Sequence, residues 1–294
     1  MNSRHKILVT GGSGFIGADV IKQLNFLNFK VLALSRKDKK NNKNIVWLKS
    51  NLNLNNSNLK KIVKFKPNIV IHLAWDKIPF FSNENCVNNL FNSITFFKKI
   101  TKIKSIHKVI VSGSCFEYSN KKGEKKESEI NLPNDYFSLS KYLLFLYLKK
   151  LFKNNIKLAW FRIFYAYGPK QRKKSLIPYL IQSIKKKNVI KLKSPKIKND
   201  FIFVEDVAKV IIKSISLNFK TGIYNLGTGT SVDANKIIKI ISKKLNKKTI
   251  LEKSSNKNKF FFKACMRKTR KTFKIKNFKT INYGIDKILF KTGV

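Results

Sequence analysis

The feature that most constrains this chain is a glycine-rich loop directly after an apolar strand near the N-terminus. Residues 6–10 read Lys-Ile-Leu-Val-Thr and run into Gly-Gly-Ser-Gly-Phe-Ile-Gly at 11–17. In this spacing the first glycine allows a tight turn, the second lets backbone N–H groups approach a pyrophosphate, and the last lets the next helix pack closely. The helix then faces the phosphates with its positive end. The loop predicts cofactor contacts from Gly11, Gly14, Phe15, Ile16 and Gly17.

Short apolar, β-branched runs alternate with longer helical patterns in the first half of the chain. This alternation is typical of βαβ units and predicts an α/β fold, a Rossmann-type doubly wound parallel sheet with ligands at the carboxyl ends of its strands. The expected strands are 6–10, 30–34, 45–48, 68–73, 108–112 and 157–163, and the expected helices are 18–27, 59–65, 87–103 and 139–154.

We expect two parts in this chain. Residues 1–165 form the NAD(P)-binding Rossmann domain, and 166–294 form mainly a smaller C-terminal substrate-binding lobe, with some segments returning to the first domain. The polar stretch 119–134 contains glycine and proline, and we expect it to be a loop over the site. The lysine-rich tail from about residue 251 has no clear pattern.

The formal net charge of +48 comes almost entirely from lysine, since 63 residues are basic and only six of them are arginine. Proteins that read nucleic-acid bases rely on the bidentate fork of arginine. We therefore expect a solvated lysine-rich surface and no dedicated nucleic-acid partner. The positive field still attracts anionic ligands such as dinucleotides and nucleotide sugars.

Cysteine usage and hydropathy indicate the compartment. Cys86, Cys115 and Cys265 are scattered, odd in number and without a C-x-x-C pair, which predicts neither a disulfide framework nor a metal site. The longest apolar run, 143–148, is too short to span a bilayer. We expect a cytoplasmic protein without a membrane partner.

Seven motifs occur in the order of a known family. They are Thr10–Gly17, His72–Trp75, Ser112–Tyr118, Ser138–Lys141, Arg162–Pro169, Asp200–Asp206 and Tyr224–Gly229. With these motifs, residues 6–240 resemble the NAD-dependent epimerase/dehydratase family of extended short-chain dehydrogenases. The second and third motifs are most similar to those of nucleotide-sugar 4-ketoreductases of the dTDP-6-deoxy-L-talose 4-dehydrogenase type. The resemblance implies an NAD(P)-dependent oxidoreductase or epimerase that acts on a nucleotide-activated deoxysugar and reduces or oxidises C4. The sequence leaves the oligomeric state open, with a homodimer as one expectation.

The end of the second strand bears on the choice of cofactor. Family members that prefer NAD have an acid there that binds the ribose 2′-hydroxyl, whereas this chain has Ser35 and Arg36. A cation attracts a 2′-phosphate, so we expect NADP, with NAD also open. The resemblance places further cofactor contacts at Asn51, Leu52, Leu73 and Ala74.

The resemblance implies a catalytic serine, tyrosine and lysine that move a proton as hydride is transferred. Ser114 matches the serine that binds the substrate oxygen, and Lys141 matches the lysine that binds the nicotinamide ribose and lowers the pKa of the tyrosine. The motif tyrosine precedes the lysine by four residues, but residue 137 here is phenylalanine. Tyr136 lies one position earlier, about 140° from Lys141 around an α-helix.

Three interpretations of this departure remain open. The helix begins late and Tyr136 reaches inward as the third catalytic residue; the enzyme acts through Ser114 and water at a reduced rate; or the fold binds nucleotide or RNA without catalysis.

The remaining candidates follow from the same resemblance. Gln171 and Arg172 are expected to bind the substrate diphosphate, while Asn199 stands where many members have an arginine. We expect His72 to be a packed strand residue, Asp206 to cap a helix beginning at Val207, and Glu117 to have no carboxylate partner.

Overall fold

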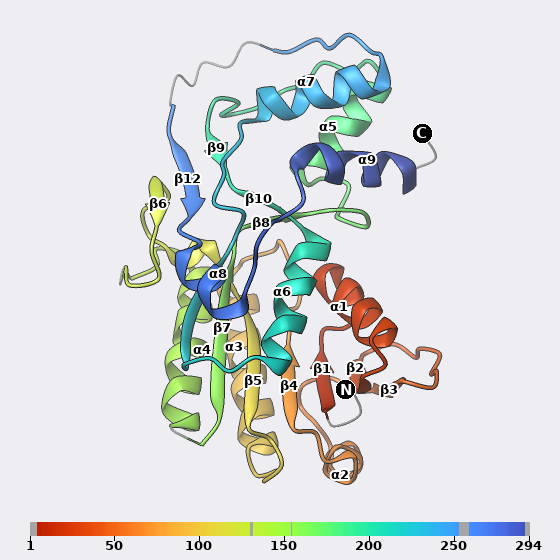
Figure 1. Cartoon of the computed structure of the whole chain (residues 1–294), viewed down its shortest axis with the longest axis vertical. Helices are drawn as coiled ribbons and strands as arrows, with labels where there is room; N and C mark the ends of the chain where they lie inside the picture. The colour runs from red at the N-terminus through yellow and green to blue at the C-terminus, as the bar shows by residue number, and fades with distance from the viewer. Residues whose placement is uncertain (1–4, 130–131, 154, 253–258, 292–294) are drawn as a thin grey trace.

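A parallel sheet of seven strands forms the centre of the fold (Figure 1). The computed structural model describes residues 5–129, 132–153, 155–252 and 259–291. The strand order is β11-β7-β5-β4-β1-β2-β3, so the chain leaves β1 toward one edge and then returns past it to build the other. This reversal beside β1 is where doubly wound sheets bind ligands. The strands are β1 (Lys6–Thr10), β2 (Lys30–Ser35), β3 (Ile45–Lys49), β4 (Ile69–His72), β5 (Lys108–Ser114), β7 (Lys157–Ile163) and β11 (Gly222–Leu226).

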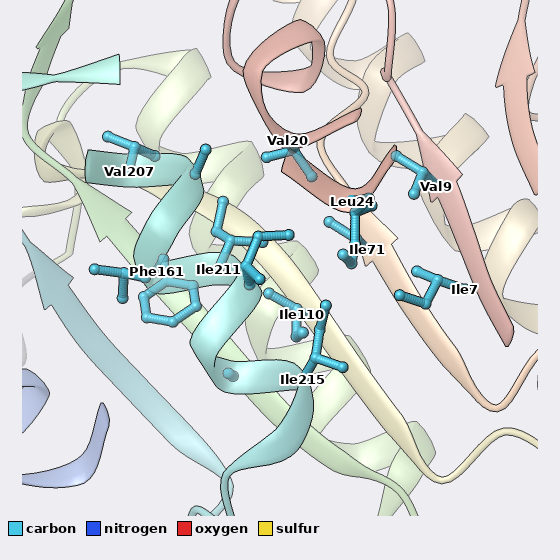
Figure 2. Close-up of a cluster of buried hydrophobic side chains, with 14 of the residues drawn as sticks. Ile7, Val9, Val20, Leu24, Ile71, Ile110, Phe161, Val207, Ile211 and Ile215 are labelled. Carbon is cyan, nitrogen blue, oxygen red and sulfur yellow. The ribbon is translucent and has the colours of Figure 1, made fainter. Parts of the chain in front are cut away.

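Helices cover both faces of this sheet because its strands are apolar on both sides. Alternate residues of a strand point to opposite faces. Ile7 and Val9 of β1 therefore pack in one cluster with α1 (Phe15–Phe26) and α6 (Val204–Ser216), as Figure 2 shows. Leu8 lies in a second cluster with the helices of the other face, α2 (Asn56–Phe65), α3 (Asn83–Ile100) and α4 (Tyr136–Phe152).

A smaller lobe lies beyond the carboxyl ends of the strands (Figure 1). Its core is an isoleucine-rich cluster from three helices, α5 (Leu176–Lys185), α7 (Ala234–Leu245) and α9 (Ile281–Lys291). Two small sheets connect it to the rest, β10-β8 and β6-β12-β9. The short elements are β6 (Gly123–Lys125), β8 (Tyr165–Tyr167), β9 (Lys198–Asn199), β10 (Phe201–Phe203), β12 (Phe261–Ala264), α8 (Arg267–Phe273) and the 3₁₀ turn η1 (Cys115–Glu117).

The predicted fold class is confirmed, and the six expected strands are all present with small shifts of their ends. Two local expectations are wrong. The four expected helices begin three or four residues earlier than expected, at Phe15, Asn56, Asn83 and Tyr136, and the expected end of the last one at Asn154 lies outside the described residues. The stretch 119–134, apart from the undescribed 130–131, is not wholly loop, because β6 pairs there with β12. The tail after residue 251, in which the sequence showed no clear pattern, contributes β12, α8 and α9.

Among the described residues after 166, two segments return to the sheet: α6 with β11, and later α8, which packs against β11 and places Phe273 in the core cluster of that face. Helix α6 packs against α1, and β11 adds the edge strand beside β7. Among the helices of the described ranges, none is long and apolar enough to cross a membrane.

Candidate active site

The glycine loop joins β1 to α1 at the point where the strand order reverses. Gly11 has a φ of +70°, and a Cβ there would lie 2.6 Å from the backbone nitrogen of Ala74, so only glycine fits. Gly14 is the N-cap of α1 and, having no side chain, leaves the first N–H groups of that helix without a side-chain acceptor. These N–H groups are suited to bind an anion at the positive end of the helix.

A cavity of about 230 Å³ opens beside this loop, at the carboxyl ends of β1, β2 and β4. Its wall brings together eight of the cofactor contacts expected from the sequence: Gly11, Gly14, Ser35, Arg36, Asn51, Leu52, Leu73 and Ala74. Of the other four, Phe15, Ile16 and Gly17 form the first turn of α1, and Lys141 lies on α4. The wall combines apolar side chains with amide and hydroxyl groups, which suits an adenosine, and the glycine loop suits a pyrophosphate.

Arg36 lies at the mouth of this cavity and forms an ion pair with a residue that the sequence did not single out. Its Nη1 is 2.6 Å from Oδ2 of Asp76, which follows β4. Both side chains line the cavity, and both are exposed. Ser35, the last residue of β2, is buried, and its hydroxyl accepts from the backbone N–H of Lys37.

Lys141 lies on α4, and its side chain contacts the carboxyl end of β5. Its Nζ is buried, donates to the carbonyl oxygen of Ser112 at 2.8 Å and lies 4.0 Å from the centre of the Trp75 ring. Burial lowers the pKa of Lys141 to about 7, and the negative charge of Glu117 opposes that shift. The amine can therefore hold or release a proton near neutral pH.

Ser114 ends β5, and a buried carboxylate fixes its backbone. The Ser114 hydroxyl accepts from the N–H of Phe116 at 3.1 Å, while its own N–H donates to Oε1 of Glu117 at 2.7 Å. This reciprocal capping box starts η1. Because the Phe116 N–H takes one lone pair, the Ser114 O–H remains able to donate to a substrate oxygen.

The Glu117 carboxylate has further partners inside the protein. It accepts from Nε1 of Trp160 and from Nε of Arg162, each at 3.0 Å, and all three side chains are buried. Burial raises the pKa of the Glu117 carboxyl, and the Arg162 guanidinium opposes the rise. One feature of the sequence indicates this arrangement, the Ser-x-x-Glu spacing of a capping box. The sequence does not indicate that Arg162, 45 residues later, is the partner of Glu117.

The structure gives Phe137 the inward position that the family's tyrosine would take. Helix α4 begins regularly at Tyr136 with Asp135 as its N-cap, so the expected late start is wrong. Phe137 is buried, stacks on Phe81 with ring centres 4.3 Å apart and meets the edge of Trp75 at 5.7 Å. Tyr136 is 55% exposed, and its position on the helix is about 100° from that of Phe137.

The remaining sequence candidates have mixed outcomes. His72 is buried in β4 as expected, and its Nδ1 lies 2.9 Å from the hydroxyl of Thr10. Burial lowers the pKa of His72 to about 3, so it is neutral. Asp206 does not cap its helix, because α6 begins at Val204 and Asp206 accepts from the N–H of Lys279 instead.

The two residues expected at the substrate diphosphate follow the turn after β8. Nε2 of Gln171 donates to the carbonyl of Ala166 at 3.0 Å, and Arg172 is exposed. Asn199 lies in β9, where its backbone pairs with Val232. For Glu117 we considered only a carboxylate partner. The structure gives it a basic one, Arg162, in a buried ion pair.

These site features together define the class of protein. A glycine loop at the reversal of a parallel sheet, an adenosine-sized cavity, and a serine and buried lysine at the next strand end are the apparatus of an NAD(P)-binding Rossmann enzyme.

Comparison with known proteins gives the family. Residues 7–227 match the model of the NAD dependent epimerase/dehydratase family, and the chain belongs to this family of NAD(P)-dependent enzymes. It is 27% identical over 266 residues, 84% of each chain, to dTDP-4-dehydro-6-deoxyglucose reductase of Escherichia coli. It is 26% identical over 244 residues, 80% of this chain and 79% of the other, to GDP-6-deoxy-D-talose 4-dehydrogenase of Aggregatibacter actinomycetemcomitans.

Solved structures agree on the fold. MoeE5 in complex with UDP-glucuronic acid and NAD superposes with a TM-score of 0.83 over 98% of both chains, at 19% identity. The resemblance inferred from the seven motifs is confirmed, and the family consists of enzymes, so the noncatalytic interpretation is not favoured.

Proposed function

We propose that this protein reduces the 4-keto group of a nucleotide-activated deoxysugar with NADPH, or catalyses the reverse oxidation. The relatives named above act as a 4-keto-sugar reductase and a 4-dehydrogenase, which supports this assignment. The observation that carries it is the buried amine of Lys141, which binds the carbonyl oxygen of Ser112 on the strand that Ser114 ends and lies 4.0 Å from the centre of the ring of Trp75, a residue of the cofactor cavity wall. The bound cofactor supplies the hydride.

The proposed roles of the protein groups follow from their positions. The Ser114 hydroxyl donates to the substrate oxygen at C4 and holds it for reduction. Lys141 binds the nicotinamide ribose and, being charged below about pH 7, stabilises negative charge that develops on that oxygen. The aromatic side chains of Trp75, Phe81 and Phe137 keep water away from this end of the site.

The missing tyrosine changes the route of the proton. Phe137 has no proton to give and Tyr136 is exposed, so we propose that the Ser114 hydroxyl gives its proton to the C4 oxygen as hydride arrives, and that the charged amine of Lys141 then reprotonates Ser114. Tyr136→Phe should then keep turnover within about twofold of the wild type. Phe137→Tyr restores the four-residue spacing and should raise turnover by about 10²-fold. Loss of turnover in Tyr136→Phe would instead show that Tyr136 is the acid.

The cofactor preference is proposed to be NADP, with NAD also accepted. Arg36, a cation of the cavity wall, supports this preference, because a guanidinium attracts a 2′-phosphate. For the sugar nucleotide, we propose that exposed Arg172, with Gln171 beside it, approaches the diphosphate from the lobe formed mainly by residues 166–294.

We propose a cytoplasmic homodimer without a nucleic-acid partner. The three cysteines are free, which suits a reducing compartment. Helices α3 and α4 contact each other and carry exposed apolar side chains, namely Val87, Phe91, Leu143 and Leu146. Such a surface suits association with a second copy of the chain.

The assignment is tested by incubating the purified protein with NADPH and dTDP-, GDP-, UDP- and CDP-linked 4-keto sugars while the absorbance of NADPH is followed. We expect oxidation of NADPH with at least one of them and its loss in Lys141→Met. Lys149→Met, at an exposed position of the same helix, is the matched control and should keep full turnover. Cofactor binding without turnover on any substrate would favour a binding protein.

A further inference from the structure

The cavity beside the glycine loop has an unusual charge balance for this chain. The protein carries 63 basic and 15 acidic residues. Yet the charged side chains of the cavity wall, among the described residues, are a single cation, Arg36, and a single anion, Asp76. The two contact each other at 2.6 Å, so the wall is close to neutral where a 2′-phosphate would bind.

Asp76 is the fixed member of this pair. Its backbone N–H donates to Oδ1 of Asn89 on α3 at 2.6 Å, and its carbonyl accepts from Nδ2 of the same side chain at 3.3 Å. Its Oδ1 accepts from the N–H of Lys77 at 2.8 Å, which leaves Oδ2 to face Arg36. Asn89 is itself buried. The carboxylate is therefore held in place at the end of β4.

Arg36 is the more exposed member of the pair. Its side chain is 69% exposed and, among the described residues, it forms an ion pair with Asp76. An arginine with this exposure is free to turn toward a new anion, but it gives up its ion pair with Asp76 when it does so. A bound 2′-phosphate would draw the guanidinium away from Asp76 and would itself be repelled by that carboxylate.

We propose that Asp76 is a specificity-determining residue, which competes with the 2′-phosphate of NADP for Arg36 and so narrows the preference for NADPH over NADH. NADH has no 2′-phosphate, so it meets neither the competition nor the repulsion. This inference rests on the proposed use of Arg36 as the phosphate-binding residue.

The test compares dissociation constants for NADPH and NADH, measured by nucleotide fluorescence, in wild type and Asp76→Asn. Asparagine keeps an oxygen for the Lys77 N–H, and the contacts with Asn89 involve the backbone, so the local fold is retained. Removing both the competition and the repulsion should tighten NADPH binding about tenfold and change NADH binding less than twofold.

Asp38→Asn is the matched control. Asp38 lies two residues after Arg36, and its carboxylate pairs with Lys49 at 2.7 Å outside the cavity wall. It removes the same charge and should leave both dissociation constants unchanged. In an Arg36→Ala background the gain from Asp76→Asn should shrink, because the residue for which Asp76 competes is absent.

Three results would overturn the inference. An NADPH dissociation constant for Asp76→Asn within twofold of wild type would do so while leaving the proposed function intact. An equal gain for NADH, or an equal gain in Asp38→Asn, would assign the effect to general electrostatics. Wild-type protein that binds neither dinucleotide would overturn the proposed function and this inference together.

Discussion

Replacing Gly14 by valine separates cofactor binding from folding. The added Cβ would meet one neighbour, the carbonyl oxygen of Gly11 at 3.2 Å, and the φ of Gly14 is an ordinary −76°. Valine is a poorer N-cap than glycine, so the free energy of unfolding should fall by about 1 kcal/mol. The valine methyl groups would, however, fill the space in front of the N–H groups of α1 that a pyrophosphate needs.

The assay is the change in melting temperature caused by NADPH. At a concentration 100 times its Kd, a ligand stabilises the folded state by about 2.7 kcal/mol. In a chain of 294 residues this corresponds to a rise in Tm of about 5 °C. Wild type should show this rise. Gly14→Val should melt about 2 °C lower without ligand and show no rise with it.

Lys22→Val provides the matched control, since it puts a valine at an exposed position of the same helix. This variant should also melt slightly lower but keep the full rise with NADPH. If Gly14→Val is stabilised by NADPH as much as wild type, the glycine loop does not bind the pyrophosphate and the site has been assigned wrongly.

Further predictions concern the buried charges and the helical surface. Glu117→Gln leaves the buried Arg162 guanidinium unpaired and should lower the free energy of unfolding by about 3 to 5 kcal/mol in chemical denaturation; a loss below about 1 kcal/mol would contradict this. Burial lowers the pKa of Lys141 to about 7 from 10.5, so the unfolded chain binds more protons between these values and this group adds stability as pH rises. Lys141→Met should therefore be more stable than wild type, most clearly below pH 7, and urea midpoints at pH 6.5 and 9.5 should show the difference shrinking; a difference that grows with pH would refute it. Leu146→Glu should convert the proposed dimer to a monomer in light scattering, and an unchanged mass would exclude this face.

The sequence predicted the central sheet well because its signals are local. Each strand is a short apolar run between polar turns, and the glycine loop marks the first crossover within about 12 residues. Strand β6 was missed for the opposite reason. It has three residues, Gly123–Lys125, and is stabilised by pairing with β12, well over 100 residues later in the chain. Periodicity within a window cannot reveal such a pairing.

The residues of the site were likewise predictable where their signal is local and not where their partners are distant in the sequence. The wall of the cofactor cavity follows strand ends that the motifs mark, so eight expected residues lie in it. Trp75, Asp76 and Glu117 gained no role from the sequence because their partners are distant. Asp76 meets Arg36 across 40 residues, and Glu117 meets Arg162 across 45. Only the fold brings these charges together.

The start of α4 shows how one residue decides an interpretation. The expected helix began at 139, which left the orientation of Tyr136 free. The side chain of Asp135 accepts from the N–H of Ser138 and fixes the start at Tyr136. With that register, the buried position beside Trp75 belongs to Phe137. An acidic N-cap before an aromatic run was the local signal for this boundary.

The most direct test of the proposed reaction follows a hydrogen isotope from cofactor to sugar. NADPH carrying deuterium at C4 of the nicotinamide, on either face, is incubated with the purified protein and the 4-keto sugar that gives the fastest turnover. We expect one deuterium at C4 of the sugar product, transferred from only one face of the nicotinamide and detected by mass spectrometry and NMR. Deuterium at another carbon of the product, or a product formed without deuterium from either labelled cofactor, would contradict it.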